Sequence, residues 1–321
     1  MALHIHSDKK FGDYVVSYPA FKTAIDVLER SFATNSSKPH AVIVHGPSGV
    51  GKSFLINRML EVHKVEDTVE LTAVPIVSVE TPAENSINGF LISFLTALGD
   101  PAPTLGVTGS KRSRVLNLLK KLNTKLIIID EAQDLIPKSG ADAKSKLIKL
   151  LKNMMNLTKI PFAMVGTSNL LEIRTADIQI KTRVKEIVQL SYFNCFDTEQ
   201  TLDFADYLSS LLSTYPRKVE GFDFCHESQQ GELVLNKDIC NLVRLALATD
   251  GCQRRIHDLL ERIAVHTKTD EVITREHFAK YWNLADLLEE KLDFNPFAKT
   301  VGFEKVAKEA QLRGIYDRDN F

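Results

Sequence analysis

The sequence predicts a layered α/β domain with a parallel sheet, followed by a smaller helical domain. Five short apolar runs read as continuous rather than alternating, which is typical of strands buried on both faces of a parallel sheet. Segments with helical spacing lie between these runs, and strand-like runs nearly stop after Tyr192. The chain has 321 residues, which exceeds the roughly 150 residues expected of one domain.

The five predicted strands, in chain order, are residues 41–45, 74–78, 125–129, 162–165 and 186–190. Two apolar stripes have helical spacing: Val115, Leu118, Leu119 and Leu122, then Leu147, Leu150, Leu151, Met154 and Met155. Strands that alternate with helices predict a five-stranded parallel sheet flanked by helices, with right-handed crossovers. We expect this domain to span residues 14–192, after an N-terminal extension of residues 1–13.

The remaining chain predicts a small helical domain over residues 193–292 and a C-terminal tail over 293–321. Its expected helices are residues 198–212, 237–249, 252–266 and 275–291. The segment 213–236 contains Pro216, Gly221 and Gly231, which favours an irregular loop. The tail mixes aromatic and charged residues without a clear core pattern. It is either a hook for a partner protein or a segment packed on its own helical domain.

Composition is that of an ordinary soluble protein, with 44% apolar and 25% charged residues. The 40 basic and 41 acidic residues give a net charge of -1, which excludes coating of nucleic acid by bulk positive charge but allows a local basic surface. No apolar run approaches the length of a membrane span, and residues 1–16 lack the apolar core of a signal peptide. The four cysteines show no metal-ligand spacing. We therefore expect a cytoplasmic protein with reduced thiols.

A complete phosphate-binding motif follows the first predicted strand. The segment Gly46-Pro47-Ser48-Gly49-Val50-Gly51-Lys52-Ser53 matches G-x-x-x-x-G-K-[ST] and precedes a helical segment. Glycines let backbone N–H groups converge on phosphate oxygens at a helix N-terminus, which already favours an anion. Lys52 adds positive charge for the terminal phosphates, and the Ser53 hydroxyl can bind Mg²⁺. The motif predicts ATP and Mg²⁺ as ligands.

Two acidic residues end the third predicted strand. Asp130 follows the apolar run and is expected beside the phosphate loop, where its carboxylate can hold Mg²⁺. Glu131 follows directly and is placed to polarise an attacking water. A site with both acids predicts hydrolysis of ATP to ADP and phosphate.

Further polar residues fall where contacts to the nucleotide are useful. Asn169, or alternatively Thr167, follows the fourth strand and can face the terminal phosphate or the water. Arg183, with Arg174 as the rival candidate, precedes the fifth strand and can stabilise the transition state in a neighbouring subunit. Arg254 opens a helix of the small domain and can reach the phosphates from that side.

In this order of motifs the chain resembles an AAA+ ATPase over residues 14–285, and within that class the TniB/TnsC transposition regulators. The segments that carry the closer resemblance are Val16–Pro19, Ile129–Leu135 and Met164–Thr167. The resemblance implies ATP-driven assembly of rings or helical filaments on double-stranded DNA, a link between a target-selection protein and a transposase, and disassembly on hydrolysis. It also implies that Tyr18 and Pro19 lie near the adenine; the alternative is a helix-entry turn. The polar and basic segment 137–146 departs from the family pattern.

Basic residues gather in two segments despite the neutral net charge. Lys111, Arg112 and Arg114, followed by Lys120 and Lys121, form the first; Lys144, Lys146, Lys149 and Lys152 form the second. Since no recognition helix, zinc finger or stacking platform is visible, we expect contact with the DNA backbone without base readout. The alternative is that these side chains are the solvated faces of amphipathic helices.

Three other functions stay open. The first is a non-catalytic scaffold, in which ATP binding drives assembly and turnover is incidental. The second is a replication initiator or loader of the Orc/Cdc6-like branch, for which a winged-helix reader is expected after the helical domain. The third is a remodeller that threads polypeptide, although no aromatic pore loop is evident.

Overall fold

The computed structural model describes residues 16–34, 38–67, 72–82, 86–136, 141–282 and 292–318. The chain forms two compact units. The first, here called the sheet unit, comprises residues 20–191. The second, the helical unit, comprises the segment up to Pro19 together with the chain from Tyr192 onward.

The sheet unit is built on a parallel sheet of five strands in the order β4-β5-β6-β1-β7, which confirms the predicted fold class. The strands are β1 (Ala41–His45), β4 (Ile76–Glu80), β5 (Leu126–Asp130), β6 (Phe162–Gly166) and β7 (Val184–Gln189). The three central strands β1, β5 and β6 are apolar and buried along almost their whole length, as strands covered on both faces require, whereas the edge strand β7 is buried only in part. A two-stranded antiparallel pair, β2 (Glu66–Asp67) and β3 (Thr72–Ala73), was not predicted.

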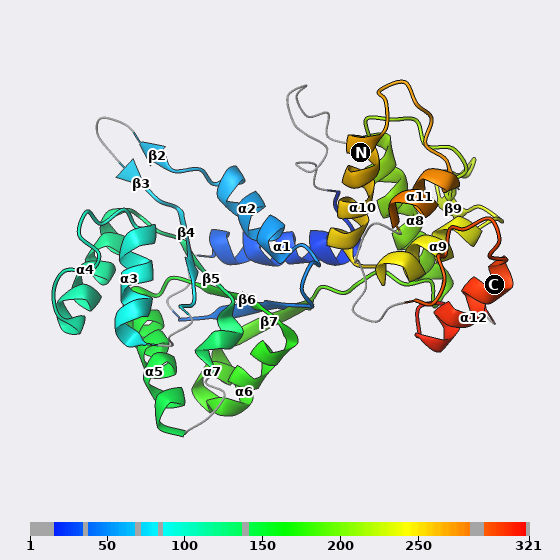
Figure 1. Cartoon of the computed structure of the whole chain (residues 1–321). Coiled ribbons are helices and arrows are strands. Elements are labelled where there is room, and N and C mark those ends of the chain that lie inside the picture. Colours follow the sequence, from blue (N-terminus) through cyan, green and yellow to red (C-terminus); the bar gives the residue numbers. More distant parts are fainter. Residues whose placement is uncertain are drawn as a thin grey trace. The chain divides into compact units, whose positions relative to one another are not determined.

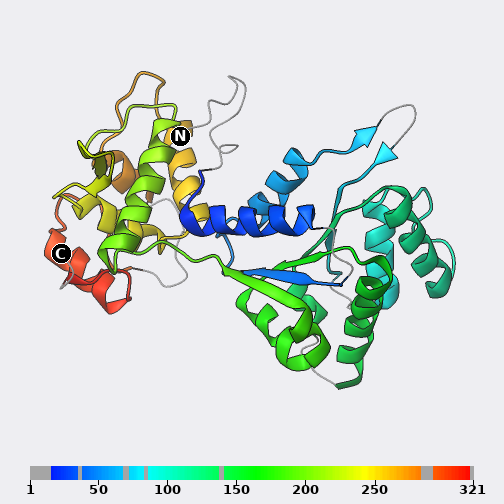
Figure 2. The same ribbon diagram turned by 180° about the vertical axis from the view of Figure 1, so that it is seen from behind.

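Helices cover both faces of this sheet (Figures 1 and 2). The helices are α1 (Pro19–Ala33), α2 (Lys52–Val62), α3 (Ile87–Ala97), α4 (Thr108–Lys121), α5 (Ala141–Thr158), α6 (Ile173–Ala176) and α7 (Ile178–Arg183), with 3₁₀ turns η2 (Ala132–Leu135) and η3 (Ser168–Glu172). The main apolar core lies between α3, α4, α5 and the face of the sheet that carries Ile127 and Ile129. Figures 1 and 2 show α1 and α2 on the opposite face.

The helical unit contains α8 (Thr198–Ser213), α9 (Cys240–Thr249), α10 (Gln253–His266), α11 (Arg275–Trp282) and α12 (Phe303–Leu312). The predicted irregular loop 213–236 instead contains an antiparallel hairpin of β8 (Cys225–Glu227) and β9 (Leu233–Leu235). Each of these strands is three residues long, too short to give a visible alternating pattern in the sequence. The last predicted helix is observed as α11; residues 283–291 of that prediction lie outside the described residues.

The C-terminal tail packs on its own helical unit. Arg244 of α9 donates hydrogen bonds to the carbonyl oxygens of Pro296 and Val301. The ring of Phe297 is fully buried, and α12 buries Val306 and Ala310. Of the two sequence-based alternatives, the structure favours a segment that completes the core of its unit.

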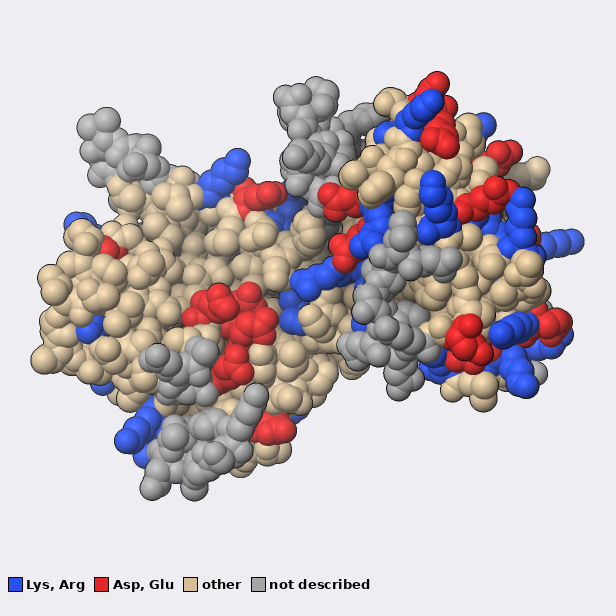
Figure 3. Space-filling model, viewed as in Figure 1, with Lys and Arg blue, Asp and Glu red and all other residues tan. Residues whose placement is uncertain are grey.

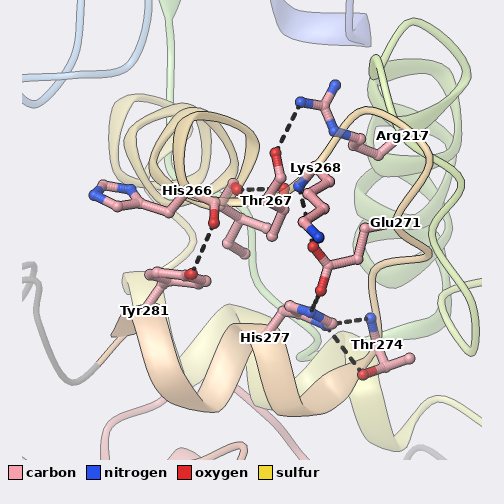
Figure 4. A network of polar contacts seen from close by, with 9 residues as sticks. Arg217, His266, Thr267, Lys268, Glu271, Thr274, His277 and Tyr281 are labelled. Atoms are coloured by element: carbon pink, nitrogen blue, oxygen red, sulfur yellow. Dashed lines mark hydrogen bonds and ion pairs between the residues drawn. The ribbon is translucent and has the colours of Figure 1, made fainter.

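A polar network fixes the connection between α10 and α11 (Figure 4). The carboxylate of Glu271 accepts the backbone N–H of Lys268 at 3.0 Å and lies 3.0 Å from Nε2 of His277. These partners hold the pKa of Glu271 below its ordinary value. The other ring nitrogen of His277 accepts the backbone N–H of Thr274 at 3.1 Å, and Arg217 donates to two carbonyl oxygens at the end of α10. These hydrogen bonds stabilise the connection between the two helices.

All four cysteines are free thiols, as predicted. Burial raises the pKa of the Cys195 thiol to about 12, so that this thiol stays protonated and unreactive at neutral pH. Within the described ranges, no helix has both the length and the apolar character of a membrane span.

Candidate nucleotide site

The phosphate loop lies at the carboxyl end of β1, between β6 and β7. Gly46 donates its N–H to the carbonyl oxygen of Gly166 at 3.1 Å, and Leu190 donates to the carbonyl oxygen of His45 at 2.8 Å. A Cβ on Gly46 would overlap the carbonyl oxygen of Leu190 and lie 3.1 Å from its carbonyl carbon. The first residue of the loop is therefore held on two sides, and only glycine fits there.

Two further glycines give the loop its curvature. Gly49 and Gly51 have φ of 81° and 98°, in the left-handed region that other residues rarely adopt. Gly51 ends the loop and α2 starts at Lys52, without a side chain that caps the helix. A helix N-terminus that emerges directly from a glycine loop presents backbone N–H groups to an anion. The loop therefore fits a phosphate group.

Lys52 and Ser53 occupy the positions that the motif predicts. Lys52 is only 8% exposed, and its Nζ donates to the carbonyl oxygens of Gly46 at 2.9 Å and Pro47 at 2.8 Å. The ammonium group therefore lies within the curve of the loop, and a bound phosphate would compete with these two carbonyls for it. Ser53 is exposed in the first turn of α2, where its hydroxyl is open to a ligand.

The acidic pair lies at the same edge of the sheet, because β5 and β1 are parallel strands that end together. Asp130 is the last residue of β5 and accepts the backbone N–H of Glu131 at 2.9 Å. Burial raises the pKa of Asp130 above its ordinary value, and the carboxylates of Glu131 and Glu80 raise it further, whereas the backbone N–H of Glu131 and the charge of Lys52 oppose the shift. Figure 3 shows acidic side chains gathered on the visible face of the sheet unit. A cation is the ligand that such a group of carboxylates favours.

Glu131 has a backbone conformation that is unusual for its residue type. Its φ of 48° and ψ of 39° are left-handed, and it directly precedes η2. A non-glycine residue held in this region costs about 1 kcal/mol or more, and such residues cluster at functional sites. This backbone conformation therefore supports the prediction that Glu131 is a functional residue.

Gln133 is a site residue that sequence reasoning missed. Its Nε2 donates to Oε2 of Glu131 at 2.5 Å, and its Oε1 accepts the backbone N–H of Thr167 at 3.0 Å. The residue belongs to the segment Ile129–Leu135 that carried the family resemblance, but no role was assigned to it. Its second partner is 34 residues away in the chain, which the sequence alone does not reveal.

The turn after β6 brings the two sensor candidates to this edge of the sheet. Thr167 immediately follows β6, and its N–H binds Gln133. Asn169 is exposed in η3, where its side chain is open to a ligand. The neighbouring Ser168 hydroxyl lies 3.4 Å from Nδ1 of His45 at the end of β1. Whether Asn169 or Thr167 senses the nucleotide stays a prediction.

The two candidates for an arginine that acts in trans lie on short neighbouring helices. Arg183 ends α7 and donates to the carbonyl oxygen of Gln179 at 2.6 Å and to Oδ1 of Asn156 at 3.0 Å. Arg174 lies in α6. Each has a buried Nε without a hydrogen-bond partner among the described residues, so this observation does not separate the candidates.

Three predicted ligand residues belong to the helical unit or its boundary. Arg254 is exposed in the first turn of α10. Tyr18 is 6% exposed, with Phe193 and Tyr207 packed edge-on against its ring at centroid distances of 5.2 and 6.1 Å. Pro19 is the first residue of α1, a position that favours proline. Their contacts with a nucleotide stay predictions, and burial argues against a freely accessible Tyr18 ring.

Lys111 does not have the exposed side chain that its predicted contact with DNA requires. Lys111 is 3% exposed, and its Nζ donates to Oδ1 of Asn88 and the carbonyl oxygen of Gly106, both at 2.9 Å. Arg114 forms two hydrogen bonds with Asp100, both 3.1 Å long. Both side chains stabilise the loop before α4, Lys111 through Gly106 and Arg114 through Asp100.

The other basic side chains of the two segments differ in exposure. Arg112 is partly exposed and bonds Oδ1 of Asn153 on α5, so α4 and α5 are neighbours. Lys152 pairs with Asp177 at 2.7 Å. The exposed lysines in these two segments are Lys120, Lys121, Lys146 and Lys149. The side chain of Lys144 lies outside the described residues.

Comparisons with known proteins give a match to one family model and a curated relative. The family model "Bacterial TniB protein" matches residues 9–193. An ORC1-type DNA replication protein of Cenarchaeum symbiosum is 29% identical over an alignment of 140 residues that covers 41% of this chain and 34% of that protein. The chain therefore spans about a third of the length of that curated relative.

Solved structures share the fold. The Aeropyrum pernix ORC2 protein in ADPNP–ADP complexes has a TM-score of 0.55 at 14% identity, over 94% of this chain and 78% of the other. The Aeropyrum pernix ORC1 protein in complex with DNA has a TM-score of 0.52 at 17% identity, over 83% of this chain and 64% of the other. At these identities the likeness shows the fold alone.

Proposed function

The chain belongs to the TniB family, and from that premise we propose that it is an ATPase that assembles on double-stranded DNA and regulates transposition. One observation carries the hydrolytic part of the proposal. A glycine loop with a buried lysine and a strand end with two adjacent carboxylates lie at the same edge of one parallel sheet. This combination of groups suits a nucleoside triphosphate and its attacking water.

Each residue has a defined part in this proposal. The loop amides and Lys52 bind the phosphates, and Ser53 and Asp130 would hold Mg²⁺, which neutralises charge on the phosphate oxygens. Glu131 orients the attacking water and accepts its proton. Asn169 or Thr167 contacts the terminal phosphate, while Arg183 or Arg174 reaches the site of a neighbouring copy.

Steady-state hydrolysis tests the catalytic proposal. Wild type and Glu131→Gln are compared with duplex DNA present, and Lys52→Ala serves as a variant that cannot grip the phosphates. We expect Glu131→Gln to bind ATP like wild type and to lose at least about a hundredfold in kcat, since a positioned base contributes that much. Equal turnover in wild type and Glu131→Gln would contradict a catalytic role and favour the non-catalytic scaffold.

Two findings of the comparisons support the proposed DNA binding. A protein with the same fold was solved in complex with DNA, and the family name points to mobile-element biology. We assign the DNA contact to the exposed lysines of α4 and α5, through the phosphate backbone. The proposed partners are a second copy of this chain, a transposase and a target-selection protein, in the cytoplasm.

A replication initiator or loader is the second candidate, favoured by the ORC1-type relative. Reconstitution separates the two functions. A transposition regulator stimulates strand transfer by its transposase in the presence of ATP, whereas an initiator promotes loading of a replicative helicase and leaves strand transfer unchanged.

A further inference from the structure

A continuous chain of hydrogen bonds joins the phosphate loop to the acidic pair. It begins where Gly46 donates its N–H to the carbonyl oxygen of Gly166. The next residue, Thr167, donates its N–H to Oε1 of Gln133, whose Nε2 donates to Glu131. All of these residues lie in the sheet unit.

The orientation of the Gln133 amide follows from chemistry. One end of the amide faces a backbone N–H, which can only donate, and the other faces the carboxylate of Glu131, which accepts when ionised. A flipped amide would place donor against donor and acceptor against acceptor. Gln133 is therefore matched to both partners in a single orientation.

Gly166 supplies a second, independent observation. A Cβ at this position would overlap Oε1 of Gln133 and lie 3.3 Å from the Gln133 backbone nitrogen. The φ of Gly166 is not positive, so the backbone itself does not require glycine there. The Gln133 amide is thus the nearest obstacle to a side chain on the last residue of β6, ahead of the backbone nitrogens of Gln133 and Ala132 at 3.3 and 3.4 Å.

We propose that Gln133 is a positioning residue that holds the Glu131 carboxylate and ties it to the turn after β6, so that a shift of this turn moves the water-activating group. The inference rests on the proposed hydrolysis by Glu131 and adds a residue and a route to it. The same turn carries both sensor candidates and is bonded to the first residue of the phosphate loop. The side-chain amide of Gln133 thereby links phosphate binding in the loop to the position of the Glu131 carboxylate.

A mutant cycle between Gln133 and Gly166 tests this route. Gln133→Ala removes the amide, and Gly166→Ala displaces it while leaving the Gly166 carbonyl in place. We expect each single variant to lose roughly tenfold to a hundredfold in kcat, as misplacement of a catalytic group does, with KM for ATP and ADP affinity within about twofold of wild type. In the double variant the alanine methyl enters vacated space, so its kcat should equal that of Gln133→Ala rather than the product of both losses.

A second readout does not depend on turnover. Hydrogen exchange of the Thr167 amide should become faster in Gln133→Ala, because its acceptor is removed, while the thermal unfolding midpoint stays close to that of wild type. Two results would overturn the role of Gln133 and leave the proposed function standing. The first is a loss of kcat in the double variant equal to the product of the two single losses. The second is a kcat of Gln133→Ala within twofold of wild type while Glu131→Gln is inactive. If wild type and Glu131→Gln hydrolyse ATP equally, the proposed function itself fails, and the role of Gln133 fails with it.

Discussion

Replacing Gly46 with alanine should damage both the fold and the nucleotide site. The added Cβ would overlap the carbonyl oxygen of Leu190 and lie 3.1 Å from both its carbonyl carbon and its Cβ. This carbonyl belongs to backbone that is itself bonded to the end of β1, since Leu190 donates to His45 at 2.8 Å. The clash therefore cannot be relieved by rotating a side chain, and the ends of β1 and β7 must separate.

The size of the effect follows from this geometry. Overpacking of a close-packed site costs about 1–3 kcal/mol, and a rigid backbone neighbour places Gly46→Ala near the upper end. With a urea m-value of about 2 kcal/mol/M, a loss of about 3 kcal/mol lowers the unfolding midpoint by roughly 1.5 M. Displacement of the loop should also weaken ATP binding by at least about tenfold, equivalent to about 1.4 kcal/mol.

Urea unfolding followed by circular dichroism and binding of a fluorescent ATP analogue measure the two effects. Gly109→Ala is the matched control, because Gly109 lies in α4 of the same unit and a Cβ added there would meet nothing within 4 Å. Alanine in a helix favours stability by about 0.5–1 kcal/mol over glycine. If Gly46→Ala unfolds and binds like Gly109→Ala, the close approach of Leu190 is not the reason for glycine at this position.

Three further predictions concern the acidic pair, the basic helix and the trans arginine. Because burial raises the pKa of Asp130 in the folded protein, ionisation of this carboxyl group destabilises the fold as the pH rises through that raised pKa. Thermal unfolding at neutral pH without Mg²⁺ should therefore show Asp130→Asn to be more stable than wild type. Lys120→Glu should weaken binding of duplex DNA and reduce the dependence of log K on log salt concentration by about one unit. Lys111→Ala should instead lower the free energy of unfolding by about 1–3 kcal/mol, because buried hydrogen bonds are lost. Equal effects of the two variants on DNA binding would contradict the burial of Lys111. Arg183→Ala should be inactive alone and regain turnover when mixed with Glu131→Gln, because one subunit then supplies the arginine and the other an intact site; no recovery on mixing would favour the rival arginine or a site without one.

The sequence predicted the central strands more accurately than the edges. The prediction for β1 matches the observed Ala41–His45, because a run of buried apolar residues ends directly at the glycine loop. The edge strand β7 begins at Val184, two residues before the prediction. Its residues alternate in burial, and its register shifts opposite Ala41, so the apolar run marks only part of the strand.

The contacts of individual side chains were harder to predict than the strands. Lys111 looked like part of a basic surface, yet its long side chain crosses to Asn88 on α3. The core of the tail uses the small residues Ala307 and Ala310, which a search for large apolar side chains misses. Gln133 and Thr167 meet only because β5 and β6 are paired strands. Each of these outcomes depends on contacts between distant segments, which local patterns do not encode.

Control of DNA-bound assembly by the phosphate site is tested by negative-stain imaging of duplex DNA with wild type and Lys52→Ala, each with a non-hydrolysable ATP analogue and without nucleotide. We expect wild type to coat DNA only with the analogue, and Lys52→Ala, folded as judged by its thermal unfolding, to leave DNA bare under both conditions. Equal coating by Lys52→Ala, or isolated wild-type monomers with and without nucleotide, would show that the phosphate site does not govern assembly.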